Sequence, residues 1–559
     1  MKFTYTKYFA AIVALGIFLI APNCIAQQVS TPPPEHRDLL APDPNQGKHF
    51  NGDSWWNYVK VLADDNMEGR DTGSDGLRRA EAYTVEQLQK SGLQPAGEHG
   101  FYQTVKLDSR HINEEKSSAA LVIGGKSQPL VLGDDAFFSA RIDLPSQEVS
   151  APLVFVGYGL KIPEANIDSF AGLDLKGKIA VYISGSPEGI AGPLSAHSQT
   201  AAVLSAALRE AGAIGVIRIM NPASMERDWS RYASARKNPA MLLADPALQD
   251  NAGLKVIMTY NPAQAEKLFA GSGHTFAEIA ALAKDRKPIP GFALTPVLKA
   301  HADIESKIIA SDNIIARLPG KEPALRDQYV VLSAHIDHIG IGEPVNGDKI
   351  YNGAMDNASG VALLLDLANF FCAHNQTQGR PLLFVFVTGE EKGLLGSRYF
   401  AAHPTVPAKS IVADINTDMF FPIMPLKTLL ILGINESSLG TKAADIARHY
   451  DLKPIDDPVP ARNIFIRSDQ YSFVLHGVPS VMLSIFGEPG TPEGDTVEKW
   501  LATRYHAPSD DLNQPIDLKA SALFEQVMLD LVLSTANADD PPTWNKDSFF
   551  RRYATSAAQ

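Results

Sequence analysis

The chain has 559 residues, of which 45% are hydrophobic and 20% are charged, so its apolar content is sufficient for the core of a globular protein. Two cysteines exclude a disulfide-rich scaffold and a cysteine-rich zinc module. The formal net charge of −13 argues against a nucleic-acid-binding surface, which needs a basic stripe. At roughly 150 residues per domain, we expect two to four domains.

The amino-terminal segment has the pattern of a secretory signal peptide. Lys2 and Lys7 precede an apolar run at residues 9–20, which is too short to cross a membrane. Cys24 and Ala26 supply the small residues that precede a cleavage site. We therefore expect cleavage after Ala26 and a periplasmic or secreted protein with no stable membrane anchor. The alternative, lipid attachment to Cys24, is disfavoured because asparagine is a poor residue just before a lipidated cysteine.

The next part of the chain changes in character near residue 119. Residues 27–50 are rich in Pro, Gln and Asp and predict a disordered lead-in. Helices are expected at 55–62 and 77–91. From about 119 to 290 the pattern is that of a compact module with βαβ connections. Its expected elements are strands at 153–159, 179–183 and 214–219 and a helix at 201–211.

From about residue 300 onward, apolar strand runs alternate with helical runs. Continuous β-branched runs separated by helices predict an α/β fold with a mostly parallel sheet that helices cover on both faces. Such sheets bind ligands at the carboxyl ends of their strands. The expected strands are 329–334, 382–387, 411–415, 429–432 and 478–483, and the helices include 359–371 and 518–535.

Several of these strands lead into imidazole or carboxylate side chains. They are His335 and Asp337 after 329–334, Glu390 and Glu391 after 382–387, and Asp418 after 411–415, with Asp356 before the helix 359–371 and Tyr505-His506 downstream. Any one of them alone is more commonly a solvated loop residue or a helix cap. Two adjacent acids after a buried strand need a reason, because burying an uncompensated carboxylate is costly. Together these residues are typical of a hydrolytic zinc site.

In chain order the motifs are His-x-Asp, Asp-Asn-Ala-Ser-Gly, Glu-Glu-x-Gly-Leu-x-Gly-Ser, Asp-Met and Tyr-His. This order resembles the M28 family of co-catalytic zinc peptidases, and its bacterial aminopeptidases in particular. The resemblance covers residues 300–535 and extends to 56–107. Residues 119–290, with Gly157-Tyr158-Gly159 and residues 174–178, resemble the protease-associated domain inserted in many members.

The resemblance implies a domain organisation. We expect a signal peptide at 1–26, an amino-terminal part of the peptidase domain at 27–118 and a smaller α/β protease-associated-like insertion at 119–295. The zinc peptidase catalytic domain is then expected at 296–540, followed by a carboxy-terminal tail at 541–559. The insertion carries none of the expected ligands, so it is interpreted as a lid or size filter that admits short peptides.

The resemblance also implies a two-zinc site. His335 and Asp418 would be ligands of one zinc, Glu391 and His506 ligands of the other, and Asp356 would bridge the two. Two such metals together acidify a bridging water. His338 is a competing ligand, but the His-x-Asp match favours His335 and gives His338 a structural role.

Catalytic roles follow from the same resemblance. Glu390 would be the general base, which takes a proton from the metal-bound water and passes it to the leaving amine. Asp337 would orient the imidazole of His335 from the second shell of ligands. Tyr505 would hydrogen-bond the developing oxyanion. Residues 467–471 match a family segment near the substrate pocket and receive no assigned chemistry.

The function that the resemblance implies is an exported zinc exopeptidase, an aminopeptidase that acts on peptides. Three alternatives stay open: a carboxypeptidase or dipeptidase of the same family, a glutaminyl-cyclase-like acyltransferase, and a non-catalytic receptor-like homologue. A receptor-like homologue would lack metal ligands, whereas all of the expected ligands are present. Preference for the amino terminus of the substrate rests on the resemblance alone.

Overall fold

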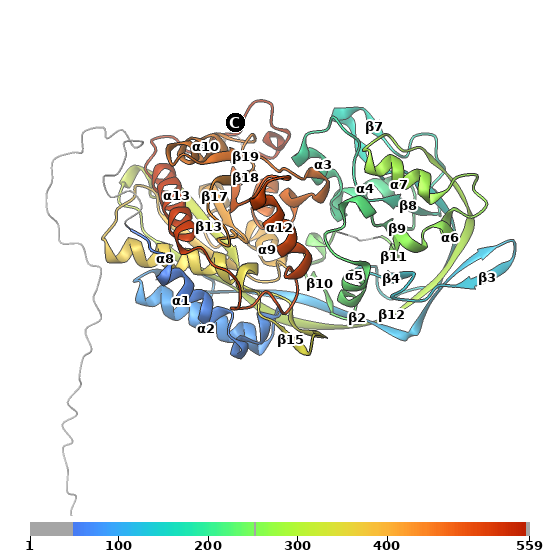
Figure 1. Cartoon of the computed structure of the whole chain (residues 1–559), viewed down its shortest axis with the longest axis horizontal. Coiled ribbons are helices and arrows are strands. Elements are labelled where there is room, and N and C mark those ends of the chain that lie inside the picture. Colours follow the sequence, from blue (N-terminus) through green and yellow to red (C-terminus); the bar gives the residue numbers. More distant parts are fainter. Residues whose placement is uncertain (1–48, 251–252, 555–559) are drawn as a thin grey trace, which may run out of the picture. The chain divides into compact units, whose positions relative to one another are not determined.

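The structure is a computed structural model, and it describes residues 49–250 and 253–554 (Figure 1). The expected signal peptide and most of the expected lead-in lie outside the described residues, as does the end of the expected carboxy-terminal tail. Within the described ranges, no helix has both the length and the hydrophobicity needed to cross a membrane.

Among the described residues, the main sheet has 16 strands, and its first part carries the expected catalytic half. The strand order there is β19-β18-β20-β17-β13-β16-β12. The central strands β16, β13, β17 and β20 are parallel neighbours, and β18 and β12 flank them as antiparallel strands. The strands of this half are β1 (Gln94–Pro95), β13 (Tyr329–His335), β14 (Gly340–Val345), β15 (Asp348–Tyr351), β16 (Leu382–Val387), β17 (Ile411–Thr417), β18 (Thr428–Leu432), β19 (Lys453–Ile455) and β20 (Ser480–Ile485).

Every residue of β13 and β16 is buried, because helices cover both faces of this part of the sheet. Val330 and Leu332 pack into one hydrophobic core with α1, α2, α8, α10, α12 and α13. Tyr329 and Val331 face the opposite core, which includes side chains of α9 and α11. The helices are α1 (Asp53–Leu62), α2 (Asp75–Lys90), α8 (Ser359–Ala373), α9 (Leu395–Ala402), α10 (Ser438–His449), α11 (Gln470–Leu475), α12 (Pro492–Thr503) and α13 (Leu518–Ala536). The predicted α/β class with a mostly parallel sheet is confirmed.

Residues 119–295, called the insertion below, contain a second run of parallel strands. The order β5-β8-β9-β11 continues the sheet, and two hydrophobic cores lie around it. Its strands are β3 (Lys126–Pro129), β4 (Ala136–Phe138), β5 (Val149–Val156), β6 (Lys161–Ile162), β7 (Ile167–Asp168), β8 (Ile179–Ile183), β9 (Gly215–Ile219), β10 (Ala240–Leu243) and β11 (Val256–Tyr260). Its helices are α3 (Gly192–Ser198), α4 (Ala201–Glu210), α5 (Trp229–Ala235), α6 (Glu266–Phe269) and α7 (Phe276–Lys284).

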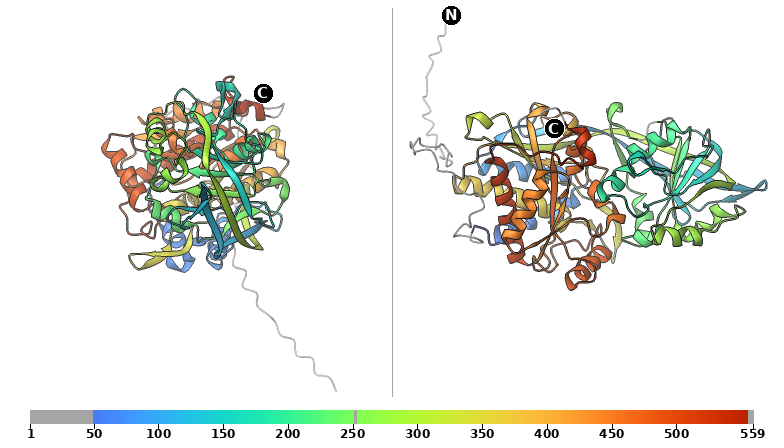
Figure 2. Two further views of the ribbon diagram at one scale, coloured as in Figure 1. Left: turned by 90° about the vertical axis from the view of Figure 1, so that its right-hand side faces the viewer. Right: turned by 90° about the horizontal axis from the view of Figure 1, so that it is seen from above.

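Two long strands join the insertion to the catalytic half. β2 (Tyr102–Ile123) and β12 (Gly291–Leu318) pair antiparallel along most of their length, from Ile314 opposite Tyr102 to Val297 opposite Val122. β12 also pairs with β16 at one end and with β5 at the other. Figures 1 and 2 show this ribbon running from the blue and yellow helices of the catalytic half into the green insertion.

The carboxy-terminal segment packs onto the catalytic half as far as it is described. Trp544 and Phe550 are buried in one hydrophobic cluster with Leu430, Tyr471 and Met482. The indole N–H of Trp544 donates to the carbonyl of Gly477 at 3.0 Å. Residues 544–550 are therefore part of the folded domain, although the sequence predicts a tail there.

Candidate metal centre and active site

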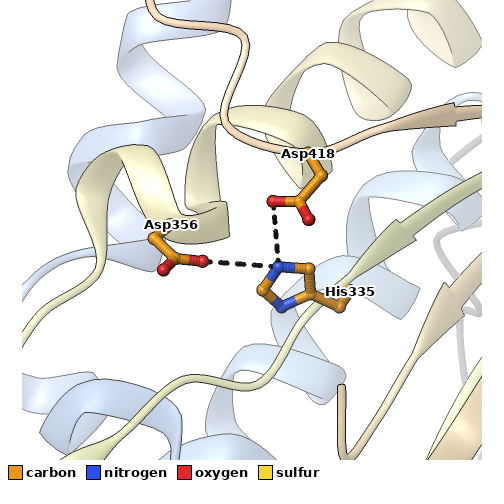
Figure 3. Close-up of side chains that lie close together, drawn as sticks. All are labelled: His335, Asp356 and Asp418. Atoms are coloured by element: carbon orange, nitrogen blue, oxygen red, sulfur yellow. Dashed lines mark hydrogen bonds and ion pairs between the residues drawn. The ribbon is translucent and has the colours of Figure 1, made fainter. Parts of the chain in front are cut away.

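One group of potential ligands gathers around His335 at the end of β13. The Nε2 atom of His335 lies 3.4 Å from Oδ1 of Asp356 and 3.3 Å from Oδ1 of Asp418 (Figure 3). Asp356 comes from the turn that precedes α8, and Asp418 directly follows β17. All three side chains are buried. They meet because two of them follow the carboxyl ends of parallel strands and the third precedes a helix at the same edge of the sheet.

A second group gathers around His506, which follows α12. Its Nε2 atom lies 3.2 Å from Oδ2 of Asp356 and 3.1 Å from Oε2 of Glu391. Asp356 therefore turns one carboxylate oxygen to His335 and the other to His506. This is the position that a ligand bridging two metal ions would take.

The donor set fits zinc. Asp356, Glu391 and Asp418 are three nearly inaccessible carboxylates, and over the described residues no lysine or arginine forms an ion pair with any of them. Several buried carboxylates without a cation are costly, and a divalent metal supplies the missing charge. Two groups have ligand atoms that all lie within 4.8 Å of one another, as metal coordination requires: His335, Asp356 and Asp418, and His338, Asp356 and Glu391.

His338 also lies in the second group, although the sequence gives it a structural role. Its Nδ1 atom is 2.7 Å from Oε1 of Glu391 and 3.9 Å from Oδ2 of Asp356. Its ring meets the ring of His506 edge-on at 5.7 Å. His338 and His335 therefore face different ligand groups and do not compete for one position. The spacing His-x-Asp-His is the sequence feature that points to a second imidazole here.

Charges in the site act strongly on one another. Burial alone would lower the pKa of His335, but the nearby carboxylates of Asp418 and Glu390 outweigh it and raise this pKa well above its ordinary value. Burial, reinforced by the charges of Glu391 and Asp418, raises the pKa of Glu390 well above that of a free glutamic acid. A carboxylate that readily holds a proton is suited to general acid and base work.

Glu390 and Asp337 are linked through the backbone. The N–H of Glu390 donates to Oδ1 of Asp337 at 3.1 Å, and the hydroxyl of Thr72 donates to Oδ2 at 2.8 Å. The Nδ1 atom of His335 lies 3.1 Å from the backbone carbonyl of Asp337 but 3.9 Å from its carboxylate. The carbonyl thus fixes the imidazole, which leaves Nε2 for a metal, and the carboxylate positions the loop that carries Glu390.

Arg70 holds the strand ends together from within the core. Its guanidinium donates to the carbonyls of Ile336, Asn352 and Gly353 at 2.7–3.0 Å and to that of Leu62. Burial lowers its pKa to about 10, although nearby carboxylates oppose this shift. Arg70 therefore connects the loop after His335 to the loop that precedes Asp356. The sequence gives no sign of this role, because it depends on tertiary contacts.

Tyr505 lies beside the second ligand group and is held by charged residues. Its hydroxyl accepts a hydrogen bond of 2.9 Å from Arg467, whose guanidinium also forms an ion pair of 2.8 Å with Glu226 of the insertion. Arg231, also in the insertion, donates to the backbone carbonyls of Ala502 and Tyr505. The insertion therefore contacts the segment that carries Tyr505 and His506, although the sequence places it far from the chemistry.

A cleft opens next to the two ligand groups. Asp356, Glu390, Asp418, Tyr505 and His506 line it at one end. Its remaining wall is mainly apolar and comprises Met419, Phe421, Leu430, Val459, Ile464, Met482, Phe486 and Leu501, with Glu226, Arg462, Arg467 and two serines as polar members. The site can therefore hold a metal-bound reacting group at its base and an apolar side chain in its wall.

The residues that carry the candidate site are similar to a known protein family. The family model described as Peptidase family M28 matches residues 313–532, a span that contains both ligand groups together with Glu390 and Tyr505. Residues 313–532 therefore match peptidase family M28. The resemblance expected from the sequence motifs is confirmed.

Two curated relatives illustrate the similarity of the M28 domain. A leucine aminopeptidase 1 of Trichophyton rubrum is 30% identical over 183 residues, which are 31% of this chain and 48% of the relative. A probable zinc metalloprotease of Pyrenophora tritici-repentis is 36% identical over 106 residues, which are 19% of this chain and 23% of the relative. The chain thus spans less than half the length of each of these relatives.

A solved aminopeptidase structure matches over a longer range. The aminopeptidase from Aneurinibacillus sp. strain AM-1 superposes with a TM-score of 0.53 at 18% sequence identity and covers 89% of this chain and 96% of its own. At this identity the likeness establishes the fold. It includes the insertion as well as the M28 domain, because 89% coverage exceeds the length of the M28 domain alone.

Proposed function

We propose that this protein is an exported aminopeptidase that uses two zinc ions to remove amino-terminal residues from peptides. The observation that carries the proposal is the shared carboxylate of Asp356, which faces His335 and Asp418 with one oxygen and Glu391 and His506 with the other. A general base candidate, Glu390, and a hydroxyl donor, Tyr505, line the same cleft.

The five ligands would hold the metals in two groups. His335 and Asp418 would bind one zinc, Glu391 and His506 the other, and Asp356 both. When bound, zinc supplies Lewis-acid chemistry, since it acidifies water and polarises a carbonyl oxygen. His338 lies close enough to Glu391 to orient it, and the carbonyl of Asp337 orients His335.

Glu390 would hold and move the proton. Its carboxylate lines the cleft, and among the described residues it forms no ion pair with the imidazoles of the ligand groups. It can therefore accept a proton from the attacking water and release it to the nitrogen of the leaving amine. The bond from its backbone N–H to Asp337 fixes the loop, which limits the positions that the carboxylate can take.

Tyr505 would stabilise the charge that develops on the carbonyl oxygen of the scissile bond. Its oxygen accepts a hydrogen bond from Arg467, so its own O–H is free to donate toward the cleft. A positively charged donor to the phenol oxygen makes the phenol a stronger hydrogen-bond donor. Preorganised donors of this kind contribute about 10²–10³-fold to the rate.

The remaining parts of the proposal concern location and organisation. A signal peptide would direct export to the periplasm or the medium and would be cleaved after Ala26. The insertion would be a protease-associated-like domain that limits the size of substrates. A carboxypeptidase or an acyltransferase of the same fold remains the alternative reading of the same metal site.

A substrate panel tests the proposal. The purified protein would be stripped with a chelator, dialysed and assayed with and without added zinc on leucine p-nitroanilide, Leu-Gly-Gly and their N-acetylated forms. We expect hydrolysis of the two free amines, little hydrolysis of the acetylated forms, loss of activity after chelation and recovery with zinc. Release of glycine from acetylated Leu-Gly-Gly would identify a carboxypeptidase and contradict the proposal.

A further inference from the structure

Arg227 is a cation of the insertion that lies beside the metal site and forms no ion pair with any residue that the structure describes. It precedes α5, and its guanidinium carbon lies 4.5 Å from the ring centre of Tyr232 and 5.4 Å from that of Tyr505. Its Nε atom is buried and makes no hydrogen bond within the described residues. Two tyrosine rings therefore contact a guanidinium whose Nε–H donor is unused within the described residues.

Arg227 lines a second cavity that reaches the metal site from the other side. Glu391, Lys392 and His506 line this cavity too, and His506 also lines the apolar cleft. The two cavities therefore meet at His506. A peptide bond placed on the ligand groups would have one flanking residue in the apolar cleft and the other on the side of Arg227.

The other cations of this second cavity are already engaged. Arg110 pairs with Asp108 at 2.8 Å, Arg236 with Glu114 at 2.6 Å, and Lys392 with Asp71 at 2.7 Å. Arg141 donates to the carbonyl of Lys392. Over the described part of the chain, Arg227 is thus the cation of the cavity that forms neither an ion pair nor a hydrogen bond.

We propose that Arg227 binds the carboxy-terminal carboxylate of a short peptide, so that the substrates are di- or tripeptides. This inference rests on the proposed function, since it needs the scissile bond to lie on the ligand groups. A planar guanidinium recognises a carboxylate through two parallel hydrogen bonds. The apolar side chain of the first residue would occupy the cleft, and the carboxylate of the second or third residue would reach Arg227.

The test compares acids with amides, because only the acid carries the proposed ligand. The values of kcat/KM would be measured for Leu-Gly, Leu-Gly-Gly and their carboxamides, with Leu-Glu-amide to separate a side-chain carboxylate from a terminal one. Leucine p-nitroanilide would report whether catalysis itself is intact. The proteins are the zinc-loaded wild type, Arg227→Gln, Arg227→Lys and the matched control Arg236→Gln, whose arginine lines the same cavity but is paired with Glu114.

We expect the wild type to prefer each acid over its amide, and Arg227→Gln to reduce that preference about 10–100-fold, the size of a hydrogen-bonded charge pair. Arg227→Lys should keep part of the preference, and Arg236→Gln should keep all of it. An unchanged preference in Arg227→Gln would overturn the inference. So would an equal effect on Leu-Glu-amide, which would assign Arg227 to an acidic side chain. If the zinc-loaded wild type cleaves none of the substrates, the proposed function itself fails, and this inference fails with it.

Discussion

The hydroxyl of Tyr505 receives its orientation from residues that are far apart in the chain. Arg467 donates to it and also forms an ion pair with Glu226 of the insertion. The side chain of Glu226 is 7% exposed. Only the Glu226 side of this ion pair is buried, and such a pair fixes geometry more than it adds stability. The position of the tyrosine O–H in the cleft is therefore set by the catalytic half and the insertion together.

Replacing Tyr505 with phenylalanine tests its role. Tyr505→Phe keeps the ring, whose centre lies 4.0 Å from that of His506 in a tilted arrangement, but removes the hydroxyl. We expect kcat on leucine p-nitroanilide to fall by about 10²–10³-fold, with KM changed little and the zinc content unchanged, because the donor acts on the transition state. Tyr232→Phe is the control, since its hydroxyl faces the backbone N–H of Glu226 at 3.4 Å. Full activity of Tyr505→Phe would contradict the assignment.

Elements built from continuous apolar runs follow closely from the sequence. The strand expected at 179–183 is β8 (Ile179–Ile183), and the strand expected at 329–334 is β13 (Tyr329–His335). The long strands β2 and β12 could not be predicted in the same way. Their central parts are mostly polar and are half-buried or exposed, as at residues 111–117, so neither a buried run nor a regular alternation marks them.

The candidate site likewise has residues that the sequence predicts and residues that it does not. The ligand residues follow strand ends, and the structure brings His335, Asp356, Glu391, Asp418 and His506 together, while their roles stay predictions. The supports of the site, such as Arg70, Glu226 and Arg227, depend on contacts between segments more than 200 residues apart. No local pattern in the sequence records such contacts.

Helix α2 carries a buried acid that couples stability to pH. Glu81 is 3% exposed. Its burial, together with the charge of Asp312, raises the pKa of its carboxyl group from 4.5 to about 8. Between these two pKa values, the folded state keeps a proton that the unfolded state has lost. The stabilisation from this proton is complete at low pH and is lost as pH rises toward 8, so the free energy of unfolding falls across this range.

Glu81→Gln should remove this dependence. We expect the variant to be more stable than the wild type at pH 8, by on the order of 2 kcal/mol, and to differ little at pH 5. Urea unfolding at both values of pH, with equal zinc, measures the difference. Glu86→Gln on the same helix is the control, since Glu86 is exposed and pairs with Lys90. A variant that is less stable than the wild type at pH 8 would count against the burial argument.

At the scale of the whole molecule, the insertion and the catalytic half act on one site. β2 and β12 run through both, and Glu226 and Arg231 reach the segment that carries Tyr505 and His506. The sequence places none of the expected ligands in the insertion. The contacts add a role in positioning the catalytic half, whereas the role of size filter stays a prediction.

The ligand groups likewise depend on the whole fold, because their members come from β13, the turn before α8, the loops after β16 and β17, and the segment after α12. The central claim is that this assembly binds two metals and keeps Glu390 free of them. Two adjacent glutamates allow a direct test, since one should serve as base and the other as ligand.

The most direct measurement is the zinc content of the wild type, Glu390→Gln and Glu391→Gln, each loaded with zinc, dialysed and analysed by elemental mass spectrometry. We expect about two zinc ions per chain in the wild type and in Glu390→Gln, whose activity should fall by about 10²–10⁴-fold because the proton acceptor is gone. Glu391→Gln should retain about one zinc ion and regain part of its activity when zinc is in excess. Loss of zinc from Glu390→Gln, or a wild type that holds fewer than two zinc ions, would contradict the account.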